Sequence, residues 1–105
     1  MTKNKKIKIL ADWLKIEIIT TDVDIEARSY YTFIWNPFKH SGDSKRLLNK
    51  LVKLKFQYDI QLRLNPKRYY FKMWNDKKQY VIFDAKNENI AISEACLRLI
   101  EDKGK

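Results

Sequence analysis

Residues 56–84 read FQYDIQLRLNPKRYYFKMWNDKKQYVIFD, and this segment decides the fold. From Phe56 to Leu64 apolar side chains alternate with polar ones, which is typical of a β-strand that buries one face. Turn sequences interrupt the segment twice, at Asn65-Pro66 and at Asn75-Asp76-Lys77. We therefore expect three strands, at residues 56–64, 68–74 and 78–84. Because short turns join antiparallel neighbours, the segment predicts an antiparallel meander.

Apolar residues recur at helical spacing on both sides of this meander. Helices are expected at residues 7–16, 44–54 and 90–100. Asp43 or Ser44 is expected to cap the start of the second helix, because short polar side chains accept hydrogen bonds from the first free N–H groups.

The segment between the first two helices is less regular. Apolar and polar residues alternate over residues 22–27, and the aromatic residues 30–35 favour a short strand before the turn at Asn36-Pro37. Helices that are separate in sequence from an antiparallel meander make an α+β domain. We expect one domain over residues 1–105, in which a small three- to four-stranded antiparallel sheet packs with two or three helices. Residues 1–6 are expected to form a flexible basic arm.

The charge of the chain is high and uneven. Its 105 residues include 22 Lys and Arg against 13 Asp and Glu, so the formal net charge is +9. Residues 1–10 carry +4 and residues 41–80 carry +8, whereas the rest of the chain is slightly acidic. An asymmetry of this kind favours a polyanionic partner. The alternative interpretation is that the lysines only keep a small protein soluble.

The residue inventory argues against several classes of protein. No apolar run reaches the roughly 18 residues that span a membrane, and no secretory signal follows the charged N-terminal residues. One cysteine and one histidine supply neither a disulfide framework nor a zinc site. The two glycines leave no glycine-rich phosphate loop. We expect a cytoplasmic protein without a membrane anchor, cofactor, metal or small-molecule substrate.

No arrangement of side chains predicts catalysis. Asp22, Asp24 and Glu26 would share one face of a strand and could hold Mg²⁺ in a nuclease. However, no companion lysine or second carboxylate motif accompanies them, so we interpret them as an exposed acidic loop or partner-binding edge. His40 has no Gly-x-Ser-x-Gly nucleophile beside it, and Cys96 lies on the apolar face of the closing helix, as a buried structural thiol does. We therefore expect no enzyme activity.

A stretch of basic and aromatic residues carries the functional hypothesis. In the strand at 68–74, the even-numbered residues point to one face, and Arg63 is expected beside them. Bases stack on flat rings while Arg and Lys neutralise phosphates, so such a face is typical of single-stranded nucleic-acid binding. The predicted contact residues are Arg46, Lys50, Lys53, Arg63, Lys67, Arg68, Tyr70, Lys72 and Trp74. The first three, on the second helix, are expected to extend the surface, and Tyr69 is a further aromatic anchor.

An alternative places the same rings in the core. Helices that covered both faces of the sheet would bury Tyr70 and Trp74, and the lysines would then lie over them.

Three short segments resemble the phage ABA-sandwich domain family, whose members are small phage and prophage proteins of largely unassigned function. Ile9-Leu10-Ala11-Asp12-Trp13-Leu14 is similar to the N-terminal helix of the family. Trp35-Asn36-Pro37-Phe38, followed by a leucine-rich helix, and the closing helix at 90–100 are the other two segments. The middle helix carries lysines where the family has tryptophan and acidic residues. The resemblance implies a phage-type accessory protein and no catalytic residues.

Charge and resemblance together lead to the expected function. We expect a non-catalytic phage-type protein that engages a host nucleoprotein complex or its effector protein, as an anti-CRISPR-like inhibitor of an RNA-guided defence complex would. One alternative is a stand-alone accessory protein that binds RNA or single-stranded DNA. Another is a protein–protein interaction module whose basic charge is incidental, with Trp35 and Phe38 as its contacts.

Overall fold

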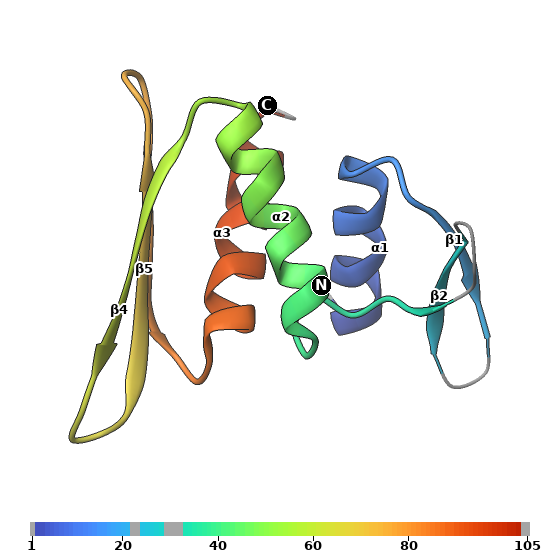
Figure 1. Cartoon of the computed structure of the whole chain (residues 1–105), viewed down its shortest axis with the longest axis horizontal. Helices are drawn as coiled ribbons and strands as arrows, with labels where there is room; N and C mark the ends of the chain where they lie inside the picture. Colours follow the sequence, from blue (N-terminus) through green and yellow to red (C-terminus); the bar gives the residue numbers. More distant parts are fainter. Residues whose placement is uncertain (1, 22–23, 29–32, 104–105) are drawn as a thin grey trace.

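The computed structural model describes residues 2–21, 24–28 and 33–103 of the chain. Along this described part, three consecutive strands separate each helix from the next. They are α1 (Lys3–Trp13), β1 (Glu17–Thr20), β2 (Ile25–Arg28), β3 (Phe33–Ile34), α2 (Ser41–Lys53), β4 (Gln57–Arg63), β5 (Arg68–Trp74), β6 (Gln79–Ala85) and α3 (Glu88–Lys103). Figure 1 shows the helices between two separate sheets.

Both sheets are antiparallel meanders. One has the order β1-β2-β3 and the other the order β4-β5-β6. The expected α+β class is confirmed, and so is the meander predicted from residues 56–84. The strands form two sheets rather than one because β1, β2 and β3, which are four, four and two residues long, pair among themselves.

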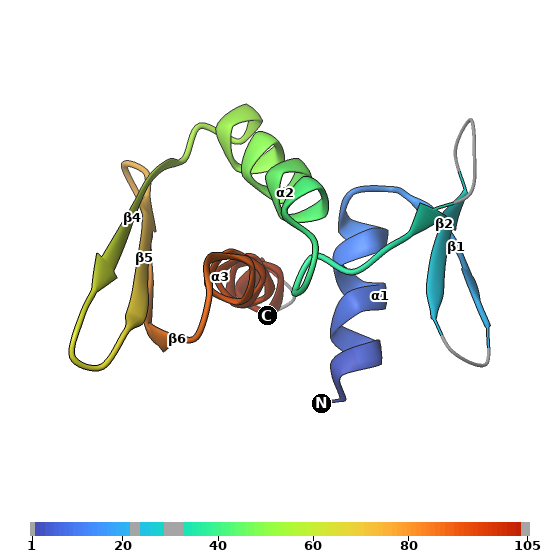
Figure 2. The same cartoon turned by 60° about the horizontal axis from the view of Figure 1, so that its bottom comes forward.

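The helices are arranged so that each sheet has a helix on one face. α1 packs on β1 and β2, whereas α3 packs on β5 and β6, and α2 lies against α3 (Figure 2). Helix α3 is central, and its small residues Ala91, Ala95 and Cys96 are fully buried. Small side chains let the neighbouring helix and sheet approach closely. Burial raises the pKa of the Cys96 thiol, so this group stays protonated and unreactive.

The first helix begins earlier than its apolar spacing predicts. Thr2 caps α1 by accepting a hydrogen bond from the Lys5 N–H at 3.3 Å. Residues 3–6 of the expected basic arm therefore make the first turn of the helix, where Lys6 pairs with Glu94 of α3 at 2.8 Å.

The predicted cap of the second helix was wrong. α2 begins at Ser41 with His40 as the N-cap residue, so Asp43 and Ser44 lie inside its first turn. Both are buried and serve tertiary contacts. The Asp43 carboxylate accepts a hydrogen bond from the Asn36 N–H at 2.9 Å, and the Ser44 hydroxyl lies 2.8 Å from the Asn89 amide oxygen. These contacts tie the helix to the turn before it and to α3, which sequence spacing does not reveal.

Candidate nucleic-acid interface

The face of the β4-β5-β6 sheet that points away from the helices gathers basic and aromatic side chains, and we call it the outer face. Strand register decides which residues share it, because directly paired residues point to the same side. Arg63 pairs with Arg68, Gln61 with Tyr70 and Asp59 with Lys72. The outer face therefore consists of Gln57, Asp59, Gln61, Arg63, Arg68, Tyr70, Lys72, Trp74, Gln79, Val81 and Phe83.

Cations and rings on the outer face are in direct contact. The Arg63 guanidinium lies 4.9 Å from the centre of the Tyr70 ring, and the Lys72 ammonium lies 5.2 Å from that of Trp74. Each is a cation–π contact, worth about 0.5–1 kcal/mol at an exposed site. The contacts fix the cations beside the rings, as the sequence predicted for Arg63, Tyr70, Lys72 and Trp74.

The helices leave the outer face uncovered. In Figures 1 and 2, α2 and α3 lie on the other side of the second sheet, where Phe71 and Met73 are fully buried. Tyr70 and Trp74 are half-buried among their neighbours in the sheet. The alternative in which these two rings pack beneath a helix is therefore wrong for the part of the chain that the structure describes.

One acidic residue interrupts the positive charge of this face. Asp59 sits opposite Lys72 in the register, and its carboxylate accepts a hydrogen bond from the Gln61 amide at 3.0 Å. Three cations, Arg63, Arg68 and Lys72, thus stand against one carboxylate. The outer face attracts anions, most strongly at the Arg63–Arg68 end, because Asp59 lies beside Lys72.

Phe83 belongs to the outer face although it is not among the contact residues predicted from the sequence. Its ring is 65% exposed and meets Tyr70 edge-on, with the ring centres 5.3 Å apart. The alternation of Tyr80 and Ile82 with their neighbours was the signal, because it places Val81 and Phe83 on the side opposite the core. A third flat ring therefore joins the two predicted ones.

Two further predicted contact residues in the turn region lie away from the outer face. The Lys67 ammonium lies 6.0 Å from the centre of the Tyr69 ring. Tyr69 pairs with Leu62 and so points to the helix side of the sheet, where it packs against the core. Tyr69 is thus not an exposed anchor, and Lys67 marks the border of the face.

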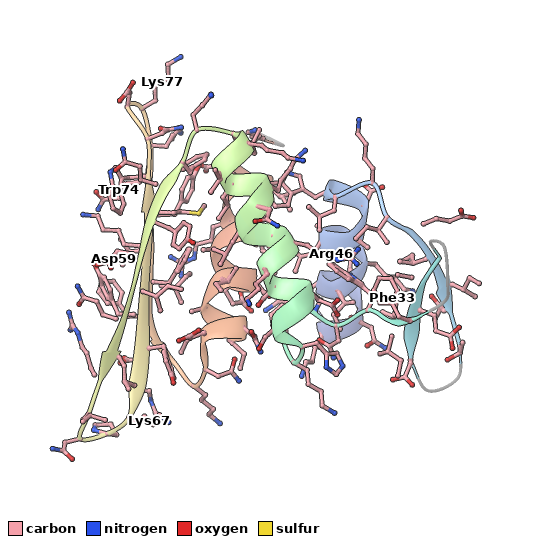
Figure 3. The ribbon with its side chains drawn as sticks, in the orientation of Figure 1. Phe33, Arg46, Asp59, Lys67, Trp74 and Lys77 are labelled. Atoms are coloured by element: carbon pink, nitrogen blue, oxygen red, sulfur yellow. The ribbon has the colours of Figure 1, made fainter. Side chains whose placement is uncertain are left out.

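The basic residues of α2 form a second surface instead of extending the first. Figure 3 shows Arg46 facing α1, on the opposite side of the helices from Trp74 and Asp59. Arg46 lies over the Phe33 ring at 4.9 Å, and Lys50 over Trp13 at 5.8 Å. With Lys53 they border a shallow cavity of about 340 Å³ that also contacts Leu14, Ile16 and Asn49. We call this surface the helix groove.

The other candidate residues that the structure describes lie in the core, in a turn, in a strand or at the start of a helix. Trp35 and Phe38 are buried, and the Trp35 indole donates a hydrogen bond to the Ile7 carbonyl at 3.1 Å, so they are core residues rather than partner contacts. Asp24 closes a turn with Thr21, and Glu26 lies in β2, whereas Asp22 falls outside the described residues. His40 is exposed at the start of α2.

Comparisons with known proteins give no family for this chain. No family model, curated protein or solved structure matches it. The resemblance to the phage family stays a prediction.

No helix in the described ranges is both long and apolar enough to cross a lipid bilayer.

Proposed function

We propose that this chain is a non-catalytic binding protein that attaches to single-stranded nucleic acid, above all RNA held in a nucleoprotein, through the outer face. One observation carries the proposal. The face that no described helix covers is also the one on which Arg63, Lys72, Tyr70, Trp74 and Phe83 come together.

The chemistry of this face suits unpaired bases better than a duplex. A duplex hides the flat sides of its bases, whereas a single strand offers them for stacking on exposed rings. Each base stacked on an aromatic side chain contributes about 1–3 kcal/mol, and neighbouring cations neutralise the phosphates. Because cations and rings alternate along β5, in the order Arg68, Tyr70, Lys72 and Trp74, one nucleotide can use both.

The finer proposal names the target. The resemblance to phage proteins favours an RNA-guided host defence complex, which the chain would inhibit by occupying its RNA or the channel that holds the RNA. Cations on a rigid sheet would speed the encounter, and the rings would anchor the complex. A stand-alone accessory protein for free RNA or single-stranded DNA is the second candidate, since the same face suits both.

A binding titration tests the outer face. Fluorescence anisotropy with labelled single-stranded RNA and DNA is measured from about 50 to 200 mM salt. For single strands, the logarithm of affinity falls with the logarithm of salt concentration by about 0.7 per phosphate contact. Arg68→Glu and Lys72→Glu should each weaken binding and flatten this slope. Lys8→Glu, at an exposed residue of α1, is the control with the same charge change.

The outcomes separate the candidates. Absence of binding to free strands at about 50 mM salt excludes the accessory protein. A loss of affinity in Lys8→Glu equal to that in Lys72→Glu would show that only net charge matters, which contradicts a defined outer face. Binding to an assembled RNA-guided complex that is tighter than binding to its RNA alone supports the inhibitor.

A further inference from the structure

The second sheet has two edges, and within the described ranges only one of them is blocked. Along β6 the pairing register shifts at a bulge opposite Tyr69 and Phe71, and Arg98 donates a hydrogen bond to the Val81 carbonyl at 2.9 Å. Bulges and covering side chains are the usual protection of an edge strand. β4 pairs with β5 over seven residues without a shift. Among the described residues, no side chain makes a hydrogen bond to the backbone of β4.

The free edge is also apolar on its helix side. Tyr58 is 41% exposed, Leu62 50% and Leu64 69%, whereas α3 packs on β5 and β6. A long, regular and apolar edge strand is a template for pairing with another strand.

We propose that β4 pairs antiparallel with β4 of a second copy of this chain, about a two-fold axis at Gln61. The sequence of the strand complements itself in this register. Asp59 faces Arg63 of the second copy, Ile60 faces Leu62, and Tyr58 faces Leu64, each twice by symmetry. Opposite charges and apolar pairs directly across an antiparallel pair stabilise it by about 0.2–1 kcal/mol each, and like charges would destabilise it.

The charge pattern favours a second copy over a foreign strand, because Asp59 and Arg63 find their partners in the chain itself. It also fixes the register. An axis at Ile60 would set Asp59 opposite Gln61 and Arg63 opposite Gln57, so neither charge would face its opposite, whereas the axis at Gln61 pairs both charges.

Pairing of the two edges makes one six-stranded sheet. Both outer faces then lie on the same side of this sheet, and both helix layers lie on the other. If the proposed function holds, a nucleic acid can run across both outer faces, and its affinity gains from two linked sites. The dimer itself is independent of nucleic acid.

Sedimentation of the full chain without nucleic acid tests this dimer. Wild type should sediment at twice the 12.7 kDa of one chain. Asp59→Arg places two arginines across each pair and should give monomers, and so should Arg63→Asp with two aspartates. The double variant Asp59→Arg/Arg63→Asp restores opposite charges and should restore the dimer. Asp76→Arg and Lys77→Asp, in the exposed β5–β6 turn, repeat the charge changes away from the edge and should stay dimeric.

Circular dichroism first establishes that every variant compared is folded, so that each change in sedimentation reports on the dimer. A wild type that stays monomeric up to about 100 μM overturns the proposal. A dimer that survives both single reversals, or one that the double variant fails to restore, overturns the β4 register. Because no nucleic acid is present, a failed dimer leaves the outer face and its titration unaffected.

Discussion

Two phenylalanines on neighbouring strands show how strand parity assigns a residue to the core or to the surface. Phe71 of β5 is fully buried against the helices, whereas Phe83 of β6 is largely exposed on the outer face. We expect Phe71→Ala to lower the free energy of unfolding by about 3–5 kcal/mol, through lost burial and the cavity it leaves. Phe83→Ala should cost less than about 1.5 kcal/mol, the upper worth of its contact with Tyr70. Urea denaturation measures both.

The affinity for single-stranded RNA should depend on Phe83, although this residue contributes little to the free energy of unfolding. Phe83→Ala should weaken single-stranded RNA binding by up to the worth of one stacked base, about 1–3 kcal/mol. A Phe83→Ala variant that unfolds like Phe71→Ala, or that binds RNA like wild type, would contradict its place among the binding rings.

Tyr80 should make the free energy of unfolding fall at alkaline pH. Its hydroxyl donates a hydrogen bond to the Asp102 carboxylate at 2.6 Å. Burial of the ring, and then the hydrogen bond and charge of Asp102, raise the pKa of Tyr80 to about 12 from the ordinary value of 10.0. The unfolded chain loses this proton first, so the stability from the raised pKa is complete below about pH 10 and is lost as pH rises through 12.

A difference measurement isolates this group from the many lysines that titrate nearby. The free energy of unfolding of wild type should fall between about pH 10 and 12, and that of Tyr80→Phe should fall less. Tyr58→Phe, at a ring that is 41% exposed on the opposite edge strand β4, is the matched control for the change of residue type. Parallel pH curves for wild type and Tyr80→Phe would contradict the role of Tyr80.

At the scale of elements, α1 and α2 end in the same way, with a lysine where glycine is usual. Lys15 and Lys55 have φ values of 59° and 69°, in the left-handed region. In α2 the Lys55 and Phe56 N–H groups bond to the Val52 and Leu51 carbonyls, both at 3.0 Å, which is the Schellman pattern. A side chain in this conformation costs roughly 1–2 kcal/mol, and glycine avoids that cost.

Lys55→Gly should therefore raise the free energy of unfolding by about 1 kcal/mol. Lys53→Gly is the matched control inside the last turn of α2, where glycine should lower it by about 1 kcal/mol. Urea denaturation at neutral pH measures the two changes, and equal losses in both variants would mean that the α2 terminus gains nothing from glycine.

The elements were predictable from the sequence to different degrees. The strict alternation in residues 56–64 is a local signal, and it located β4 to within a residue. The cap of α2 was mispredicted because Asp43 and Ser44 bond to Asn36 and Asn89, which are tertiary partners. Which side of the sheet the helices cover is also a tertiary property. The sequence therefore placed Arg63 beside Tyr70 correctly, but it wrongly placed Arg46 on an extension of the same surface.

At the scale of the whole molecule, the helix layer separates two basic surfaces. The outer face and the helix groove lie on opposite sides of α2 and α3, in a molecule that extends 36 × 33 × 26 Å (Figure 3). Exposed charges are screened beyond about 10 Å at 0.1 M salt and beyond about 30 Å at 0.01 M. The two surfaces should therefore act separately at moderate salt and together only at low salt.

This separation predicts how a hexanucleotide responds to charge reversal. At about 0.1 M salt, Lys50→Glu/Lys53→Glu in the helix groove should change its affinity less than about twofold, because the charges are screened. Lys72→Glu on the outer face should weaken it several-fold. At about 0.01 M salt the groove variant should weaken binding too, since its field then reaches across the molecule. Anisotropy titrations at both salt concentrations measure this, and a groove variant that loses as much as Lys72→Glu at 0.1 M would move the binding site from the sheet to the helix groove.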